Sequence, residues 1–195
     1  ALRLRERGHE IVFAAREDSR LRQRLDKEGI RVELLAMRAG LHLVSRWRDF
    51  LRLRQVVAEF RPDIIHCHRS AENWMVALTR SRFQPRPALA RTRHVANPYG
   101  NDPFSRWNLT RGTDAWIAVS EAVLEAMELP ASWGDERRPT GVVGAVNLDE
   151  FHPRRRNHDL RRYFGVGPDD VWIGLVGRFQ RIKGQPVFID AAARL

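Results

Sequence analysis

The chain has 195 residues, an apolar share of 43% that is ordinary for a globular protein, and 34 Lys plus Arg against 24 Asp plus Glu, a net charge of +10. No apolar run approaches the ~18 residues of a membrane-spanning helix, and the N-terminus lacks a signal-peptide pattern. Cys67 is the only cysteine, so an intrachain disulfide is excluded and a reducing, cytoplasmic setting is expected.

Strand and helix alternate along the chain, a pattern typical of a parallel α/β sheet with helices on its faces. Apolar runs predict strands at residues 9–15, 31–35, 63–66, 88–92, 115–119 and 141–143. The segments between them predict helices at residues 18–28, 47–60, 71–79, 104–111 and 120–127. Asp18 or Ser19 is suited to cap the first of these helices and Ser120 the last, while residues 95–103 read as a loop.

The character of the chain changes after residue 151. Residues 152–158 are polar and basic, and a short helix (160–164), an apolar strand (171–176), a turn (177–184) and a helix (185–195) follow. We therefore expect a first domain at residues 1–150, a linker at 151–168, and the start of a second domain at 169–195. One strand and one helix cannot close a core, and Ala1 begins in mid-helix, so both ends are expected to continue in a longer protein. The alternative is one small domain whose last unit joins the first sheet.

The turn after the last predicted strand carries two cations and two glycines, Gly177-Arg178-Phe179-Gln180-Arg181-Ile182-Lys183-Gly184. Ligands of open α/β sheets gather at the carboxyl ends of strands, and a helix N-terminus there attracts anions. Arg178 and Lys183 would bind phosphate oxygens, and Gly177 would let them approach the backbone. The alternative is that both cations are merely solvated, although Lys27 is the only other lysine.

This turn resembles the Gly-Arg-Leu-x-x-x-Lys-Gly signature of glycosyltransferase family 4, which has the GT-B fold of two Rossmann-like domains. Other segments resemble that family in the expected order: residues 62–68 (PDIIHCH), 92–94 (TRH), 113–121 (TDAWIAVSE) and the opening LRERGHE. Residues 143–153 resemble its interdomain hinge, with Gly144 and Ala145 in place of Asn-Gly and Asn147 in place of Asp. The resemblance covers nearly the whole chain.

The resemblance implies a GT-B N-terminal acceptor-side domain that lacks its first strand, followed by a truncated donor-binding domain. It implies a retaining, hexosyltransferase-like enzyme that uses a nucleotide-diphosphate sugar and needs no cofactor and no metal. Arg178 and Lys183 would hold the donor diphosphate, and His94 would contact the transferred sugar. Because the family's glycine-rich loop and Glu-x7-Glu segment are absent, the chain alone is expected to be inactive or nearly so.

Histidines mark the expected site on the first domain. His94 follows the strand at 88–92, so its imidazole could hydrogen-bond a sugar hydroxyl or stabilise charge, or else only bind nearby backbone. His66 and His68 alternate on a strand and could point to one face, lining the cleft together with Ser120. Cys67 would point away from them, so a metal site is not expected. Asp114 is interpreted as a helix-end or surface group.

Two tryptophans lie among arginines: Trp47 beside Arg46 and Arg48, and Trp107 near Arg106 and Arg111. Such a mixture suits an anionic membrane or nucleic acid. A peripheral contact on the inner face of the cytoplasmic membrane fits better, because many enzymes of the family glycosylate lipid-linked acceptors such as cell-envelope glycans. A basic nucleic-acid-binding module and a GT-B nucleotide-sugar epimerase are the two alternative functions, and no specific nucleic acid partner is expected.

Overall fold

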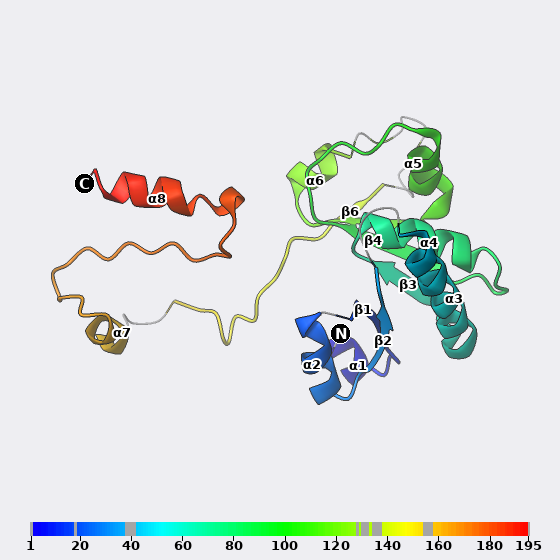
Figure 1. The fold of residues 1–195 in the computed structure, drawn as a ribbon, viewed down its shortest axis with the longest axis horizontal. Helices are drawn as coiled ribbons and strands as arrows, with labels where there is room; N and C mark the ends of the chain where they lie inside the picture. The colour runs from blue at the N-terminus through cyan, green and yellow to red at the C-terminus, as the bar shows by residue number, and fades with distance from the viewer. Residues whose placement is uncertain are drawn as a thin grey trace. The chain divides into compact units, whose positions relative to one another are not determined.

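The computed structural model describes residues 2–17, 19–37, 42–127, 129, 133, 138–153 and 158–194. Contacts within the chain divide it into two compact units, Ala1–Ala145 and Val146–Leu195 (Figure 1). Each unit is described by itself.

The first unit contains two all-parallel sheets in its described residues, in agreement with the predicted α/β class. The smaller sheet pairs β1 (Val12–Arg16) with β2 (Arg31–Leu35). The larger sheet has the order β3-β4-β5-β6 (Figure 1). Its strands are β3 (Ile64–Cys67), β4 (Ala88–Arg93), β5 (Ala115–Ala118) and β6 (Thr140–Gly141). One continuous sheet was expected. Among the described residues, however, no strand pairs with a strand of each sheet, so the two sheets are separate.

Helices connect these strands, because parallel strands need a crossover connection. Their bounds are α1 (Leu2–Glu6), α2 (Arg20–Lys27), α3 (Leu43–Phe60), α4 (Ser70–Arg80), α5 (Pro103–Trp107) and α6 (Glu121–Glu125). Ser19 caps α2 by accepting from the Leu21 N–H, and Ser120 caps α6 by accepting from the Val123 N–H. Ser19 and Ser120 thus act as predicted, and Asp18 lies outside the described residues.

Two helices differ from the prediction. The helix α3 begins at Leu43 rather than residue 47. The prediction missed its first turn because Leu43 and Val44 are exposed and do not continue the core-facing stripe. The helix expected at 104–111 is α5 followed by a π-helical turn, η1 (Asn108–Gly112). An ideal Cβ on Gly112 would lie 2.9 Å from Asn108 Oδ1, so only glycine fits where this turn ends.

The main core of the first unit lies between the larger sheet and helices α3 and α4. It is built from Leu53, Val57, Cys67, Met75, Val76, Ala77 and Leu89. A second cluster of Leu109, Trp116 and Met127 lies at the other end of this sheet. These clusters fix the strands whose ends carry the candidate site.

A buried arginine ties α4 to the larger sheet. The Arg80 guanidinium, 1% exposed, donates to the carbonyls of Pro87 and Gly112 at 2.9 Å each and to the Asp114 carboxylate. Asp114 also accepts from the Leu89 N–H at 2.7 Å. Burial would raise the pKa of Asp114, but hydrogen bonds from Arg80 and Leu89 outweigh it and hold that pKa below its ordinary value. Asp114 lies at the surface, as expected, with its side chain 33% exposed, and it also holds Arg80 and the Leu89 N–H in place.

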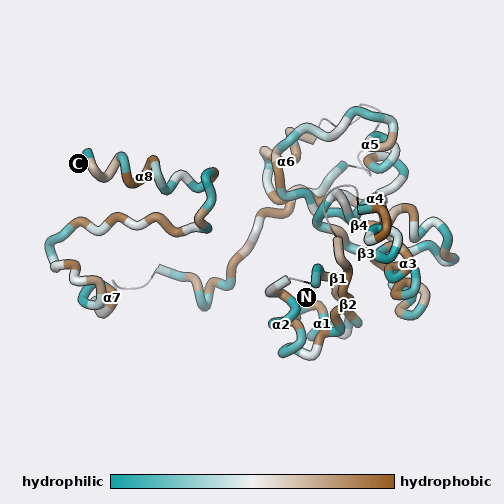
Figure 2. Tube along the Cα trace, in the orientation of Figure 1, coloured by the Kyte–Doolittle hydropathy of each residue, from teal (hydrophilic) through white to brown (hydrophobic). Residues whose placement is uncertain are grey.

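The second unit contains α7 (His158–Tyr163), a 3₁₀ turn η3 (Arg181–Lys183) and α8 (Gln185–Ala192) in its described residues. The strand predicted at 171–176 is wrong: this apolar run (Figure 2) is extended chain without a ladder. A strand needs a neighbour to accept its backbone hydrogen bonds, and neither sheet includes this segment, so the single-sheet alternative is not supported either. Its residues Val171, Val176 and Ile173 are exposed.

Candidate functional site

Three histidines meet at the carboxyl ends of β3 and β4. His66 and His68 come from the end of β3 and place their ring centroids 4.4 Å apart, as alternation on a strand predicts. His94 directly follows β4, and its Nε2 lies 3.1 Å from His68 Nδ1. The arrangement forms a row of imidazoles on one side of the sheet edge.

Thr92 anchors one end of this row. Its hydroxyl lies 2.7 Å from His66 Nε2, and Thr92 itself is buried in β4. Sequence reasoning did not assign this contact, although Thr92 belongs to the Thr-x-His segment. The hydrogen bond fixes the orientation of the first ring and, through ring packing, that of His68.

Burial favours the neutral imidazoles of His66 and His68. Burial lowers the pKa of His66, and the charge on His94 lowers it further. Burial also lowers the pKa of His68, with smaller contributions from the charges on His66 and His94. A neutral imidazole offers one donor and one acceptor, which suits hydroxyl groups better than it suits anions.

Cys67 points to the opposite side of β3, where it joins the core. Burial raises the pKa of this thiol to about 12, so it is protonated and a poor nucleophile at neutral pH. Among the described residues, no three His, Cys, Asp or Glu side chains are arranged to hold a metal ion.

Ser120 follows β5 and therefore ends on the same carboxyl edge as His68 and His94. Its hydroxyl caps α6 by accepting from the Val123 N–H at 3.3 Å. This hydrogen bond gives Ser120 a structural function at the start of α6.

Sequence reasoning missed a buried arginine on the core side of β4. Arg91 donates to Ser70 Oγ at 2.5 Å and to the Tyr99 hydroxyl at 3.2 Å, and its guanidinium lies 4.9 Å from the Trp116 ring centroid. The partners are neutral oxygens and an aromatic face, which offset part of the desolvation cost. The sequence signal that could have revealed it is a pair of arginines, Arg91 and Arg93, inside a strand that begins with apolar residues.

The second of these arginines shapes the loop after His94. Arg93 donates to the backbone carbonyls of Val95 and Asn97 and lies over the Tyr99 ring. Burial lowers the pKa of Arg93, and the nearby charge of Arg91 lowers it further. Because both carbonyls belong to the segment that follows His94, Arg93 fixes the backbone from which the His94 side chain projects.

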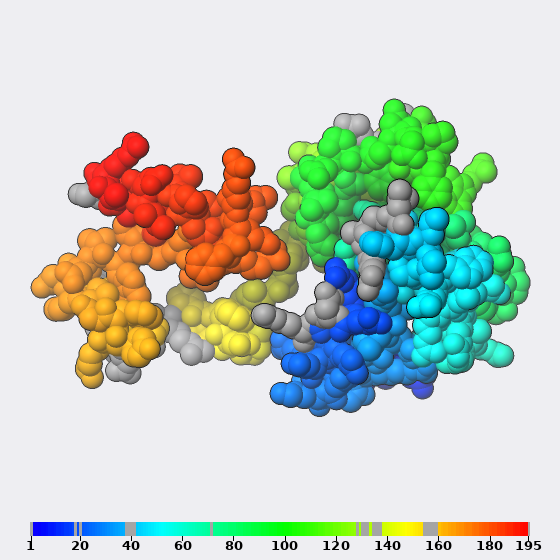
Figure 3. Space-filling view, in the orientation of Figure 1, coloured from blue at the N-terminus to red at the C-terminus, as the bar shows by residue number. Residues whose placement is uncertain are grey.

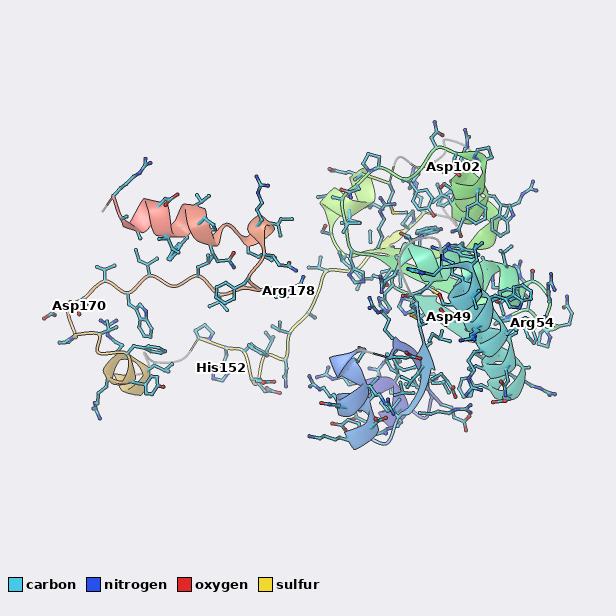
Figure 4. All side chains as sticks on the ribbon, in the orientation of Figure 1. Asp49, Arg54, Asp102, His152, Asp170 and Arg178 are labelled. Carbon is cyan, nitrogen blue, oxygen red and sulfur yellow. The ribbon has the colours of Figure 1, made fainter. Side chains whose placement is uncertain are left out.

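The second unit holds the other predicted residues in one turn before α8. A Cβ built on Gly177 would lie 3.7 Å from Lys183 Cγ, so the aliphatic stem of Lys183 passes over the glycine. The Gln185 side chain closes the turn by donating to the Arg178 carbonyl at 2.7 Å (Figure 4 labels Arg178). Gly184 adopts φ +70°, a left-handed conformation that favours glycine, and caps α8. The turn therefore carries both cations at the start of a helix, where an anion is favoured.

No helix within the described residues is long and apolar enough to cross a membrane.

The chain is 30% identical over 148 residues to a D-inositol 3-phosphate glycosyltransferase of Thermobifida fusca. The matched region covers 68% of the chain and 33% of that protein. It is also 30% identical over 173 residues to the protein of the same name from Paenarthrobacter aurescens, covering 80% of the chain and 40% of that protein. The chain thus spans between a third and two-fifths of the length of these relatives.

Among solved structures, MurG of Acinetobacter baumannii matches with a TM-score of 0.52 and 11% identity, over 75% of the chain and 40% of MurG. This similarity confirms the predicted GT-B type of fold for the matched part. Residues 1–130, two-thirds of the chain, match the sequence family described as Glycosyltransferase Family 4. The chain belongs to glycosyltransferase family 4.

Proposed function

We propose that the chain is the acceptor-side domain, with the start of the donor-binding domain, of an enzyme that transfers a hexose-like sugar from a nucleotide-diphosphate donor with retention of configuration. Membership of the family over residues 1–130 supports transfer as the reaction class. The observation that carries the site is the row of histidines at the carboxyl edge of β3 and β4.

His94 is the residue we assign to the transferred sugar. The His68–His94 contact engages Nδ1 of His68 and Nε2 of His94, so the second nitrogen of each ring is the one available to a substrate. His94 is exposed, whereas Thr92 beside it is buried. An imidazole in this position would hydrogen-bond a sugar hydroxyl and stabilise charge in the transition state.

Arg178 and Lys183 are the residues we assign to the donor diphosphate. Both belong to the turn that precedes α8, and Lys183 lies against Gly177. Two cations would neutralise the leaving diphosphate, so we propose that the reaction needs no metal. In this proposal the donor itself helps to deprotonate the attacking hydroxyl, and no side chain is assigned as general base.

We propose a lipid-linked or cell-envelope glycan as the acceptor, used at the inner face of the cytoplasmic membrane. The names of the relatives supply a second acceptor to test, D-inositol 3-phosphate. The basic and aromatic surface of the first unit favours the membrane-bound acceptor. A small soluble acceptor such as D-inositol 3-phosphate would not require an exposed tryptophan on the enzyme.

The test uses the full-length protein encoded around this chain, incubated with a panel of nucleotide-diphosphate sugars and both kinds of acceptor. Product masses identify the transfer, and NMR of the anomeric proton gives the stereochemistry. We expect transfer with retention that persists in EDTA. Conversion of the nucleotide sugar without an acceptor would replace this proposal by the epimerase, and inversion would contradict the mechanism.

A further inference from the structure

The helix α3 is apolar on two sides. Leu53, Val56 and Val57 are buried on its inner side. Its first half also exposes four large apolar residues, with exposed fractions of 73% for Leu43, 69% for Val44, 62% for Trp47 and 45% for Leu51. An amphipathic helix of a globular domain would carry polar residues there.

These four residues share one face. At 3.6 residues per turn, Leu43, Trp47 and Leu51 follow one another along the helix about one turn apart, and Val44 lies beside them. The same geometry puts the buried residues on the opposite side. Figure 3 shows α3 (cyan) at the surface of the first unit. We name Leu43, Val44, Trp47 and Leu51 the outer face of α3.

Aromatic contacts link α3 to α5. Arg46 of α3 lies 5.8 Å from the Trp74 ring centroid, and Trp74 meets Phe104 of α5 edge-to-face at 6.4 Å. Phe104 is itself 48% exposed. Isolated exposed apolar residues are normal, whereas a contiguous set marks a contact surface.

The charges beside the outer face are positive. Arg48 and Arg54 lie at its edges, and neither forms an ion pair with another described residue. Asp49, the acidic residue in the first half of α3, is buried and accepts from the Ala36 and Met37 N–H groups at 2.8 Å each. In Figure 4, Asp49 and Arg54 lie on different sides of α3. The Asp49 carboxylate is thus buried, whereas Arg48 is exposed and Arg54 is partly exposed.

We propose that the outer face of α3 docks onto an anionic lipid membrane, with Leu43, Val44, Trp47 and Leu51 in the interfacial region and Arg48 and Arg54 on lipid phosphates. The inference rests on the proposed membrane contact and assigns its surface. Apolar side chains, interfacial tryptophan and flanking arginine are the features of helices that lie in a membrane interface.

Two other occupants fit less well. Nucleic acid would use Arg48 and Arg54, but it would leave Leu43 and Val44 without a partner. A second copy of the chain in a two-fold contact would bring the same arginines against each other. Both occupants give distinct results in the test below.

The experiment measures sedimentation of the full chain with phosphatidylcholine vesicles that contain or lack phosphatidylglycerol. The apolar variant is Leu43→Ser with Trp47→Ser, matched by Leu4→Ser with Leu21→Ser, two exposed leucines of α1 and α2. The charge variant is Arg48→Gln with Arg54→Gln, matched by Arg7→Gln with Arg24→Gln. Circular dichroism establishes that each variant is folded.

We expect binding to anionic vesicles that weakens about fivefold for each arginine removed from the face, roughly 25-fold for the pair. The apolar variant should lose binding, whereas both matched controls should bind within about twofold of the wild type. Trp47 fluorescence should shift to shorter wavelength with anionic vesicles, a change that Trp47→Phe removes.

Three results would overturn the inference. If all variants bind vesicles equally, the membrane contact stands but lies elsewhere. If the wild type does not bind vesicles, the proposed membrane contact is wrong. The transfer assay described above still tests the proposed reaction independently of this result. Oligonucleotide binding or dimerisation that depends on the outer face, without vesicle binding, would assign this surface to nucleic acid or to a second copy.

Discussion

His68 and His94 belong to different strands, and their imidazole nitrogens lie 3.1 Å apart. One nitrogen of this pair donates and the other accepts, so the contact holds the two rings in a fixed relative orientation. The pair thus connects the end of β3 to the residue that we assign to the transferred sugar, and it makes His68 a positioning residue.

Substituting His94 should remove interactions with the transition state, whereas substituting His68 should only change the orientation of His94. We expect His94→Ala to lower kcat of the full-length enzyme by about 100-fold or more, His68→Ala to have a smaller effect, and His68→Gln to restore part of it. Steady-state kinetics measures all three against His9→Ala, an exposed histidine of the same unit. Wild-type kcat in His94→Ala would rule out its assigned role.

The histidine row should make stability depend on pH above the range where carboxylates titrate. Burial holds the pKa of His66 and His68 below the ordinary value of about 6.5. As pH falls through that value the unfolded chain takes up protons that the folded chain does not, so stability falls. We expect Tm to decrease between about pH 7.5 and 5.5, and to decrease less in His66→Gln with His68→Gln. An unchanged pH dependence in that double variant would contradict this interpretation.

Breaking the Arg80–Asp114 pair should unfold the first unit more readily. Asp114→Ala leaves a guanidinium that is 1% exposed without its carboxylate, and we expect a loss of about 3 kcal/mol in the free energy of unfolding. Arg86→Ala removes the other arginine on Asp114, whose side chain is 50% exposed, and should cost about 1 kcal/mol or less. Urea unfolding followed by circular dichroism compares the two variants. Equal losses in the free energy of unfolding would show that the contact with buried Arg80 stabilises the unit no more than the contact with exposed Arg86.

Much of the first unit could be predicted from the sequence because its strands are short apolar runs between clear helix signals. The alternation of His66, Cys67 and His68 predicted which side each would take, and the structure confirms it. Position after a parallel strand predicted that His94 would lie near them. These inferences succeed because they depend only on local geometry.

Other features depend on tertiary partners and were missed or wrong. Arg91 and Arg93 are buried because aromatic rings and carbonyls receive them, which periodicity does not reveal. The predicted strand at 171–176 has the composition of a strand but no partner in either sheet. The early start of α3 was missed because its outer face breaks the amphipathic pattern.

Gly112 should tolerate no side chain. A Cβ there would lie 2.9 Å from Asn108 Oδ1 and 3.2 Å from the Trp107 ring, inside the network that includes Asn73. We expect Gly112→Ala to cost about 1–3 kcal/mol by overpacking. Gly144→Ala is the control, because nothing lies within 4 Å of its Cβ position. Thermal unfolding measures both, and a neutral Gly112→Ala would show that the π-helical turn repacks freely.

The most direct test of the central claim is calorimetric binding of a nucleoside diphosphate to the full-length protein. The variants Arg178→Ala and Lys183→Ala are compared with Arg181→Ala, a cation of the same turn that we leave without a role. We predict that each of the first two weakens binding by at least about tenfold, a loss of one charge-assisted contact, while Arg181→Ala binds like the wild type. Equal affinity in all four proteins would contradict the diphosphate site and, with it, the proposed transfer mechanism.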